Sequence, residues 1–365
     1  MPALKKIVVQ NFRNIAFQEL SFSPNINCIS GNNGEGKTNL IDAIYYLSMT
    51  KSALATTDKF NFKHGSDSFT VAGTYLMPDG LESRFSIQTR LDGDKKVKRD
   101  DKTYQKASEH IGVLPIVLVS PADITLVSTS GDERRKFVNS VLSQMDRAYL
   151  SDVQQYNRYL LQRNRLLKDK DPDEDLLCAF DARLEMLAEP IAARRREFVA
   201  SLTPVVQDFY HELSGGKEEV SIEYVTDMDK GPLSAQLLGH REVDKALKFT
   251  RSGVHRDDFV FTMDGYPIRK CGSQGQQKSF LVSLKFAQYE LMKRSYGFAP
   301  ILLLDDLFDK LDMGRVSNLL SMVAGSDFGQ IFLTDSNKVR LEGIVDALTD
   351  DRSYFETVAG EFTKL

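Results

Sequence analysis

The chain has 365 residues and a net charge of −4, so it is long enough for two domains, and any nucleic-acid partner must meet a local basic patch. Hydrophobic residues make up 42 % of the chain and charged residues 27 %, and no apolar run approaches the ~20 residues that span a bilayer. The three cysteines lie too far apart in the sequence to suggest a metal site and fit a reducing compartment, so we expect a cytoplasmic protein without membrane contact.

A glycine-rich segment near the N-terminus carries the first functional signal. It follows an apolar strand predicted over 24–29 and precedes apolar residues at helical spacing. The segment consists of Gly31, Asn32, Asn33, Gly34, Glu35, Gly36, Lys37 and Thr38. In such a turn, backbone N–H groups surround a triphosphate, Lys37 would reach the β- and γ-phosphates, and the Thr38 hydroxyl would ligand Mg²⁺. A turn without a ligand would not need this strand and helix, so the segment predicts ATP binding.

The first third of the chain otherwise predicts strands. Apolar residues alternate over 6–12, 69–75 and 84–88, and a hairpin-type turn signal at 78–80 separates the last two. A continuous apolar run at 114–119 predicts a strand buried on both faces.

The middle of the chain changes to helical periodicity. Apolar residues recur every three or four positions over 138–167, and a second helical stretch covers 177–198 after an acidic break at 171–175. Pro190 and Pro204 should kink or divide that second helical stretch. Two helices joined by a short acidic turn predict an antiparallel arm.

A second phosphate-binding surface is predicted farther along the chain. After strands at 220–225 and 258–263, small and polar residues that include Ser273, Gly275 and Gln276 open a helix. The glycine-rich segment would already enclose its own phosphates, so the economical explanation is that this loop serves the nucleotide of a second subunit. The alternative is an ordinary capped helix.

A buried strand at 301–304 ends in two carboxylates, Asp305 and Asp306. The first is placed to hold Mg²⁺ and its hydration shell, and the second can polarise water as a general base. Alone, two acids at a strand end would equally be a cap or a solvated terminus, but beside an ATP-binding loop they predict the second half of the site. The long separation between Lys37 and Asp305 indicates an insertion, for which the helical arm is the candidate.

These three segments, in this order, resemble the head ATPase of the ABC family, in its structural-maintenance-of-chromosomes (SMC) branch. Further segments along essentially the whole chain are similar to the RecF family of bacterial recombination and gap-repair ATPases. Those segments are 11–14, 120–123, 134–137, 143–144, 159–168, 252–258 and 273–278. The resemblance implies an α/β fold, an ABC/SMC-type P-loop head with mixed sheets and an inserted α-helical arm. We expect a discontinuous head over 1–125 and 215–365, and an arm over 126–214.

The resemblance also implies a function. It implies a homodimer that forms on ATP binding and engages single-stranded and double-stranded DNA at gaps and junctions, with slow hydrolysis resetting it. It further implies work alongside RecR and RecO to load the RecA recombinase, in replication restart, recombinational repair and the SOS response to DNA damage. The expected enzyme is a weak, DNA-stimulated ATPase that acts as a switch.

The resemblance assigns roles residue by residue. Lys37 and Thr38 become the phosphate and Mg²⁺ ligands, Ser273 the serine that acts on the partner's nucleotide, and Asp305 the Mg²⁺-associated carboxylate. Asp306 stands where the wider ABC family usually has Glu, and a shorter acid farther from the water fits slow hydrolysis.

Several positions depart from the family pattern or leave it open. Lys310 replaces the glutamate common in RecF sequences, shortly before Asp312, which matches the loop that touches the partner head. The strand that ends near Thr334 and Asp335 lacks the switch histidine of ABC transporters, and either residue is a candidate for sensing the γ-phosphate.

His255 and Arg256 allow two interpretations. They are an attractive functional pair within the segment 252–258. Equally, Arg256 could form a structural ion pair with one of the two aspartates that follow it.

Basic residues of the predicted arm are the candidates for DNA contact. They are Arg158, Arg163, Arg165 and Lys168 on its first helix and Arg194 and Arg195 on its second. Neutralising phosphates in this way gives binding that depends on salt and not on sequence. The alternative is solubilising charge on an exposed helix. No base-reading motif is visible, so specificity should be for DNA shape or junctions.

Three other functions fit the sequence less well. A nuclease-associated SMC-like ATPase would need an added domain with clustered acids, and a transporter ATPase subunit would not need the arm or the Ser273 loop. A scaffold that binds ATP without hydrolysing it stays open, and ATP turnover with and without gapped DNA would separate it from a switch.

Overall fold

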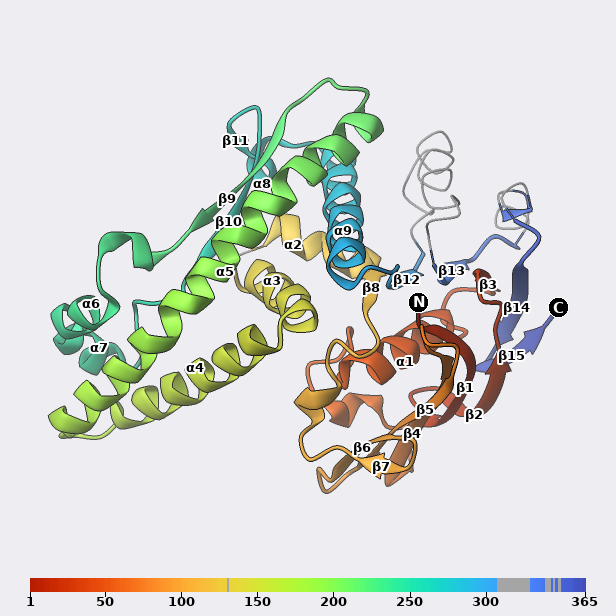
Figure 1. Cartoon of the computed structure of the whole chain (residues 1–365), viewed down its shortest axis with the longest axis horizontal. Coiled ribbons are helices and arrows are strands. Elements are labelled where there is room, and N and C mark those ends of the chain that lie inside the picture. The colour runs from red at the N-terminus through yellow and green to blue at the C-terminus, as the bar shows by residue number, and fades with distance from the viewer. Residues whose placement is uncertain (130, 307–328, 339–342, 344, 347–348) are drawn as a thin grey trace. The chain divides into compact units, whose positions relative to one another are not determined.

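The computed structural model describes residues 1–129, 131–306, 329–338, 343, 345–346 and 349–365 (Figure 1). The chain divides into two compact units. Unit 1 comprises Met1–Asp123 and Gln288–Leu365, and unit 2 comprises Ile124–Ala287. Helix α9 (Gln274–Tyr296) begins in unit 2 and ends in unit 1. Among the described residues, no helix has the length and apolar character needed to cross a membrane.

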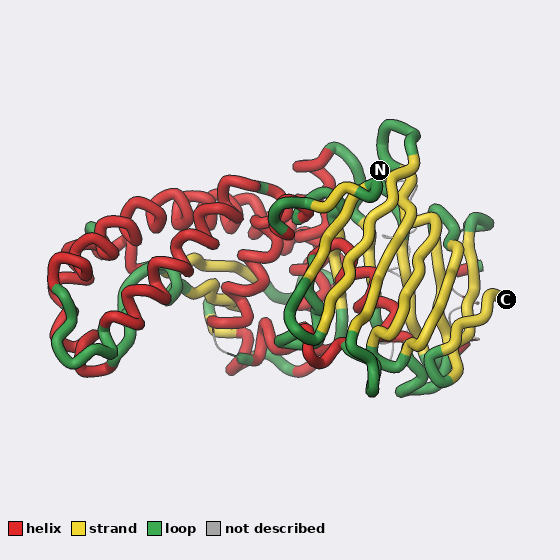
Figure 2. Tube along the Cα trace, turned by 90° about the horizontal axis from the view of Figure 1, so that it is seen from below, coloured by secondary structure: helices red, strands yellow, loops and turns green. Residues whose placement is uncertain are grey.

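Unit 1 contains a six-stranded antiparallel sheet in the order β2-β1-β4-β5-β6-β7. Its strands are β1 (Ala3–Phe12), β2 (Ile15–Ser21), β4 (Ser68–Leu76), β5 (Glu82–Arg90), β6 (Lys95–Arg99) and β7 (Lys102–Thr103). Figure 2 shows the long strands of this unit side by side. The alternating sequence of β5 buries every second side chain, as expected for a strand with one face on a core. The strands predicted over 6–12, 69–75 and 84–88 are confirmed.

The second sheet of unit 1 has the order β15-β14-β3-β13-β12-β8 and is parallel except for its last strand, β15. Its strands are β3 (Ile26–Ser30), β8 (Ile116–Val119), β12 (Ile301–Leu304), β13 (Ile331–Asp335), β14 (Arg352–Val358) and β15 (Glu361–Lys364). Strands β3, β8, β12 and β13 are buried at every position, which explains the continuous apolar runs of β8 and β12. Helix α1 (Lys37–Met49) shares one hydrophobic core with both sheets.

The carboxyl ends of β3, β13 and β12 lie at one edge of the parallel sheet. Ser30 at the end of β3 pairs with Asp335 of β13, and Leu333 of β13 pairs with Leu304 of β12. Because chains leave parallel strands at this edge, it is where α/β proteins usually bind ligands. The glycine-rich segment follows β3 at this edge, and Asp305 follows β12 at the same edge.

Unit 2 is built on helices α3 (Gly131–Met145), α4 (Arg147–Leu166) and α5 (Glu174–Ser214). Helices α4 and α5 pack side by side and form the predicted helical hairpin (Figure 1). Of the two effects predicted for Pro190 and Pro204, division of the second helix is wrong, since α5 continues through both, and a kink stays a prediction. Each proline removes one backbone donor, and the long buried face of α5 compensates for that loss.

A three-stranded sheet and short helices complete unit 2. They are β9 (Val220–Val225), β10 (Asp258–Met263), β11 (Tyr266–Pro267), α2 (Thr125–Ser128), α6 (Leu233–Gly239), α7 (Arg241–Leu247) and α8 (Ile268–Cys271). The sequence predicts that the arm ends at residue 214, whereas in the structure residues 215–287 belong to the same unit as the arm. The reason is that β9 and α6 pack on α5, and β10 packs on α3. Assignment of this segment to an ATPase head stays a prediction.

Candidate nucleotide site

The glycine-rich segment forms the predicted turn from β3 into α1. Gly31, Gly34 and Gly36 have φ angles of 152°, 89° and 117°, which residues with a Cβ atom rarely adopt. Gly36 is the N-cap of α1, and no side chain caps that end of the helix. The N-terminal N–H groups of a helix without a side-chain cap, together with its dipole, favour an anion.

Lys37 lies inside this turn with only 3 % of its surface exposed. Its Nζ donates to the carbonyl oxygens of Gly31 at 2.7 Å and Asn32 at 3.2 Å, and to Asn33 Oδ1 at 3.5 Å. All three acceptors are neutral. A phosphate oxygen would be a stronger, charge-assisted acceptor for the same ammonium group, so the predicted phosphate ligand has the required position and an exchangeable set of partners.

Thr38 and Asp305 come together as the sequence predicts for a Mg²⁺ site. The Thr38 hydroxyl donates to Asp305 Oδ1 at 3.1 Å. Neighbouring oxygen ligands of Mg²⁺ lie roughly 3 Å apart, because each Mg–O bond is about 2.0–2.1 Å long. The donor set therefore fits the ion. Among the described residues, no group of three or more His, Cys, Asp and Glu could hold a metal ion.

Asp305 is 3 % exposed, and its burial raises the pKa of the carboxyl group above its usual range. The negative charge of Asp306 raises this pKa further, whereas hydrogen bonds from Thr334 and Thr38 and the charge of Lys37 lower it. A divalent cation at this position would favour the ionised carboxylate.

Thr334 of β13 connects the two acids, a role that the sequence did not reveal. Its hydroxyl donates to Asp305 Oδ1 at 2.8 Å and accepts from the backbone N–H of Asp306 at 2.9 Å. Asp306 has a left-handed backbone with φ of 42°, and Thr334 is fully buried. The sequence makes Thr334 a candidate for sensing the γ-phosphate but does not predict its hydrogen bonds to the two acids. Lys310 and Asp312 lie outside the described residues.

The Ser273 loop of unit 2 forms a reciprocal cap at the start of α9. The Ser273 hydroxyl accepts from the Gln276 N–H at 3.3 Å, and Gln276 Oε1 accepts from the Ser273 N–H at 2.7 Å. Gln276 Nε2 also donates to Glu218 at 2.9 Å. Ser273 and Gly275 are exposed. The capped helix is present, and the role toward a second subunit stays a prediction.

Two of the six predicted DNA contacts, Arg163 and Arg195, are wrong because both side chains are buried. Arg163 is 0 % exposed, with Nε 2.6 Å from Asp181 and Nη1 2.9 Å from Asp244. Arg195 is 3 % exposed, with Nη1 2.5 Å from Asp257. Both guanidinium groups are thus paired with buried carboxylates and do not face solvent.

The sequence contained a signal for the burial of Arg163. Tyr149 and Tyr156 precede it at intervals of seven residues and are also buried. Seven residues are close to two helical turns, so the three side chains lie on one stripe of α4.

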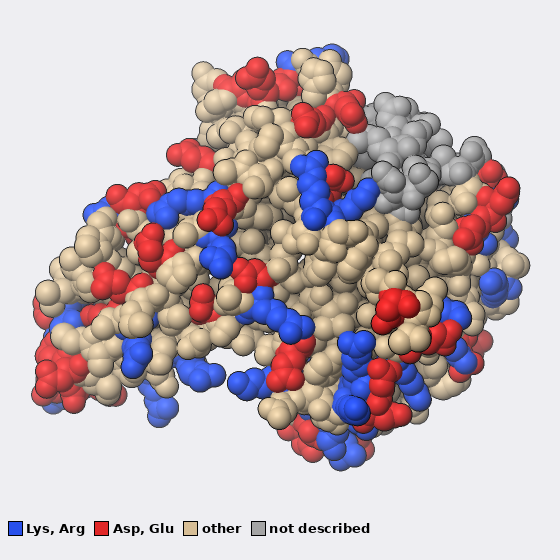
Figure 3. All heavy atoms as spheres, in the orientation of Figure 1, with Lys and Arg blue, Asp and Glu red and all other residues tan. Residues whose placement is uncertain are grey.

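The other four predicted contacts, Arg158, Arg165, Lys168 and Arg194, are exposed. Arg194 pairs with Asp146 at 2.8 Å. Acidic and basic side chains are mixed over the face shown in Figure 3. Any nucleic-acid contact would therefore be local.

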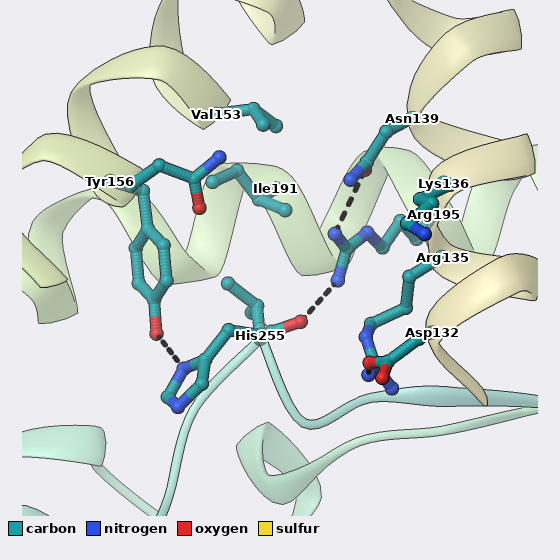
Figure 4. A pocket seen from close by; sticks show the side chains of 11 residues that line it. Asp132, Arg135, Lys136, Asn139, Val153, Tyr156, Ile191, Arg195 and His255 are labelled. Carbon is teal, nitrogen blue, oxygen red and sulfur yellow. Dashed lines mark hydrogen bonds and ion pairs between the residues drawn. The ribbon is translucent and has the colours of Figure 1, made fainter. Parts of the chain in front are cut away.

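His255 lines a cavity of about 260 Å³ in unit 2, together with Tyr156, Arg135 and Arg195 (Figure 4). His255 Nδ1 lies 2.9 Å from the Tyr156 hydroxyl, and Nε2 lies 3.0 Å from the Thr250 carbonyl oxygen. Burial lowers the pKa of His255 to about 4, so the ring is neutral near pH 7. With both nitrogens engaged, this histidine has a structural position.

The alternative ion pair between Arg256 and the aspartates that follow it is not formed. Asp257 pairs with Arg195 at 2.5 Å, and Asp258 pairs with Arg134 at 2.8 Å. Arg256 itself is exposed. The segment 252–258 therefore connects to α3 and α5 through its acids and leaves Arg256 at the surface.

Comparisons with known proteins agree over nearly the whole chain. Residues 3–349 match the family described as RecF/RecN/SMC N terminal domain. The chain is 42 % identical over 358 residues to the DNA replication and repair protein RecF of Parabacteroides distasonis, covering 98 % of each. It is 40 % identical over 361 residues to that of Porphyromonas gingivalis, covering 98 % of this chain and 99 % of that protein.

Solved structures give the same picture. A structure of the recombination mediator protein RecF with ATP is 30 % identical, with a TM-score of 0.90, and the match covers 100 % of this chain and 98 % of that one. An Smc head domain from Pyrococcus furiosus is 16 % identical with a TM-score of 0.59, covering 100 % of this chain and 96 % of that one, and shares the fold.

Proposed function

Because the chain belongs to the RecF family, within the RecF/RecN/SMC N-terminal domain family, we propose that it is an ATP-dependent DNA-binding protein of recombinational gap repair and replication restart. The predicted ABC/SMC-type α/β fold with an inserted helical region is confirmed. The observation that carries the proposal is the convergence of Lys37, Thr38, Asp305 and Thr334 at one edge of the parallel sheet.

ATP binding would use groups that already face one another. The Lys37 ammonium would leave the carbonyls of Gly31 and Asn32 for the phosphates, and the start of α1 would hold a phosphate by its free N–H groups. Mg²⁺, held by Thr38 and Asp305, would neutralise charge on the phosphates. Asp306 would accept a proton from the attacking water, and its short side chain favours slow turnover.

The Ser273 loop would complete the site of a second copy of the chain. Ser273, Gly275 and Gln276 are preorganised by the cap at the start of α9, and Ser273 and Gly275 are exposed. Two copies would then enclose ATP between them, and hydrolysis would release the homodimer. Ser273→Arg should leave ATP binding by the monomer intact but block dimerisation, because added bulk and charge lie at the joining surface.

Helix α4 offers the surface that suits DNA best. Arg147, Arg158 and Arg165 are separated by 11 and 7 residues, close to three and two helical turns, so they share one face and span roughly 27 Å at ~1.5 Å per residue. All three are exposed, and none forms an ion pair within the described part of the chain. Lys168 extends this set, and Arg194 stays a weaker candidate because it has Asp146 as a partner.

Two features of this α4 face favour a phosphate backbone. The exposed residues between the arginines include Ser151, Gln154 and Gln162, which carry no charge. Arg147 occupies the first position of α4, where the helix dipole disfavours a cation, so helix stability does not explain it.

RecR, RecO and RecA are the protein partners that the family resemblance implies.

The decisive experiment measures ATP turnover and DNA affinity of the full chain. Turnover should be slow, rise with gapped DNA, and accompany ATP-dependent dimerisation in sedimentation. ATP and DNA binding without turnover would favour the scaffold. DNA-independent turnover, with no DNA affinity at low salt, would overturn the proposal.

A further inference from the structure

We propose that two β-hairpins of unit 1 hold the ATP-binding loop in its binding conformation, with Asn14, Thr357 and Gly360 as positioning residues. One hairpin joins β1 to β2 through residues 13–14, and the other joins β14 to β15 through residues 359–360. We name this arrangement the two-hairpin clamp. The inference rests on the proposed function, because it concerns the same ATP site.

The C-terminal hairpin binds both the main chain and the side chain of Glu35, which lies in the middle of the loop. The Gly360 N–H donates to the Glu35 carbonyl oxygen at 2.8 Å, and the Thr357 hydroxyl donates to the same oxygen at 3.3 Å. The Ala359 N–H donates to the Glu35 carboxylate. Glu35 is thus held through its main chain and its side chain, by contacts that do not involve Lys37 or Thr38.

The N-terminal hairpin joins the same point to helix α1. Asn14 Nδ2 donates to the Glu35 carbonyl oxygen at 3.1 Å, and Asn14 Oδ1 accepts from Asn39 Nδ2 at 2.7 Å. The neighbouring Arg13 forms an ion pair with Asp42 of α1 at 2.8 Å. The loop and the helix that must present N–H groups to a phosphate are therefore fixed to one turn.

Two loop glycines are packed against the clamp. A Cβ atom on Gly31 would lie 2.6 Å from the Thr357 carbonyl oxygen, and one on Gly36 would lie 2.8 Å from Asn14 Nδ2. A Cβ atom on Gly34 would meet nothing within 4 Å. The absence of a side chain at Gly31 and Gly36 therefore lets Thr357 and Asn14 approach the loop.

The two hairpins belong to different sheets and are joined to each other. Gln18 of β2 donates to the Phe362 carbonyl oxygen at 2.9 Å and accepts from the Phe362 N–H at 3.1 Å. A Cβ atom on Gly360 would lie 2.8 Å from the Asn14 carbonyl oxygen. Holding the loop in this way reduces the conformational entropy lost when ATP binds, so loosening the clamp should weaken ATP without touching a phosphate ligand.

Two glycines with nearly equal φ angles allow a matched test. Gly360 has φ of 84° and Gly80, in the turn between β4 and β5, has φ of 82°, but a Cβ atom on Gly80 would meet nothing within 4 Å. Alanine at either position carries similar left-handed strain. Only Gly360→Ala should press on Asn14 and displace the clamp.

The experiment measures the Kd of the full-length variants for a fluorescent ATP analogue without DNA, together with their melting temperatures. Gly360→Ala should bind at least about tenfold more weakly than wild type, and Gly80→Ala within about twofold, with similar melting temperatures for the two variants. Equal affinities of the two variants would overturn the clamp.

A second variant covers the case in which Gly360→Ala does not fold. Asn14→Ala removes the bonds to Glu35 and Asn39 from a partly exposed turn and should also weaken analogue binding about tenfold. Wild-type affinity in Asn14→Ala would count against the clamp. Failure of the wild-type chain to bind the analogue would instead overturn the proposed function on which the clamp rests.

Discussion

The ATP loop of unit 1 and the arm of unit 2 both bury basic side chains, but they give them different partners. Within the described part of the chain, the Lys37 ammonium donates only to neutral oxygens of its own loop. Arg163 contacts two carboxylates, those of Asp181 and Asp244, and Asp181 also pairs with Arg241 at 2.7 Å. A buried cation with neutral acceptors can exchange them for an anionic ligand, whereas one with carboxylate partners is committed to the fold.

The largest expected effect tests the exchangeable partner. Lys37→Ala should abolish ATP binding and with it ATP-dependent dimerisation, because the loop loses the ammonium group that would bind the β- and γ-phosphates. The fold should survive, since Lys37 forms no ion pair within the described part of the chain and its three acceptors are neutral. Analogue titration and sedimentation with ATP measure both. A variant that still dimerised with ATP would refute a homodimer built around the nucleotide.

The next largest effect tests Arg163, the buried cation with carboxylate partners. Arg163→Ala should lower the free energy of unfolding by about 3–5 kcal/mol, because it leaves Asp181 and Asp244 buried with fewer cations. Arg165→Ala, two residues away and exposed, is the matched control and should change it by less than about 0.5 kcal/mol. Chemical denaturation gives both numbers. Equal stabilities would mean that the buried network contributes nothing to unit 2.

Only part of the ATP site could be predicted from the sequence. The ATP loop is contiguous, and Asp305 directly follows a recognisable strand, so local pattern located both and the family resemblance supplied the fold. Thr334 reaches Asp305 only because β13 lies beside β12, and residues 359–360 reach Glu35 only because β14 pairs with β3. Strand order and register decide these contacts, and neither is written in local sequence.

A smaller effect tests whether Thr334 organises the two acids. Thr334→Val keeps the shape of a buried strand residue but removes the hydroxyl that contacts Asp305 and Asp306. We expect kcat for ATP to fall about tenfold, equivalent to ~1.4 kcal/mol in the barrier, with a smaller change in KM. Thr334→Ser retains the hydroxyl and should recover most of the rate. Equal kcat values in wild type and Thr334→Val would remove Thr334 from the site.

The smallest effect concerns Arg165, an exposed residue of α4 that forms no ion pair within the described part of the chain. Arg165→Ala should weaken DNA binding to a similar degree for every sequence, and should lower the slope of log K against log salt concentration by about 0.9 if Arg165 neutralises one phosphate of B-DNA. Arg194→Ala is the control, because Arg194 already has Asp146 beside it and should release fewer counterions. Binding isotherms at several salt concentrations give both slopes. A slope unchanged by Arg165→Ala, with unchanged affinity, would place the DNA surface away from α4. If Arg165→Ala changes this slope without lowering the free energy of unfolding, Arg165 contributes to DNA binding, whereas Arg163, two residues earlier on the same helix, contributes to stability.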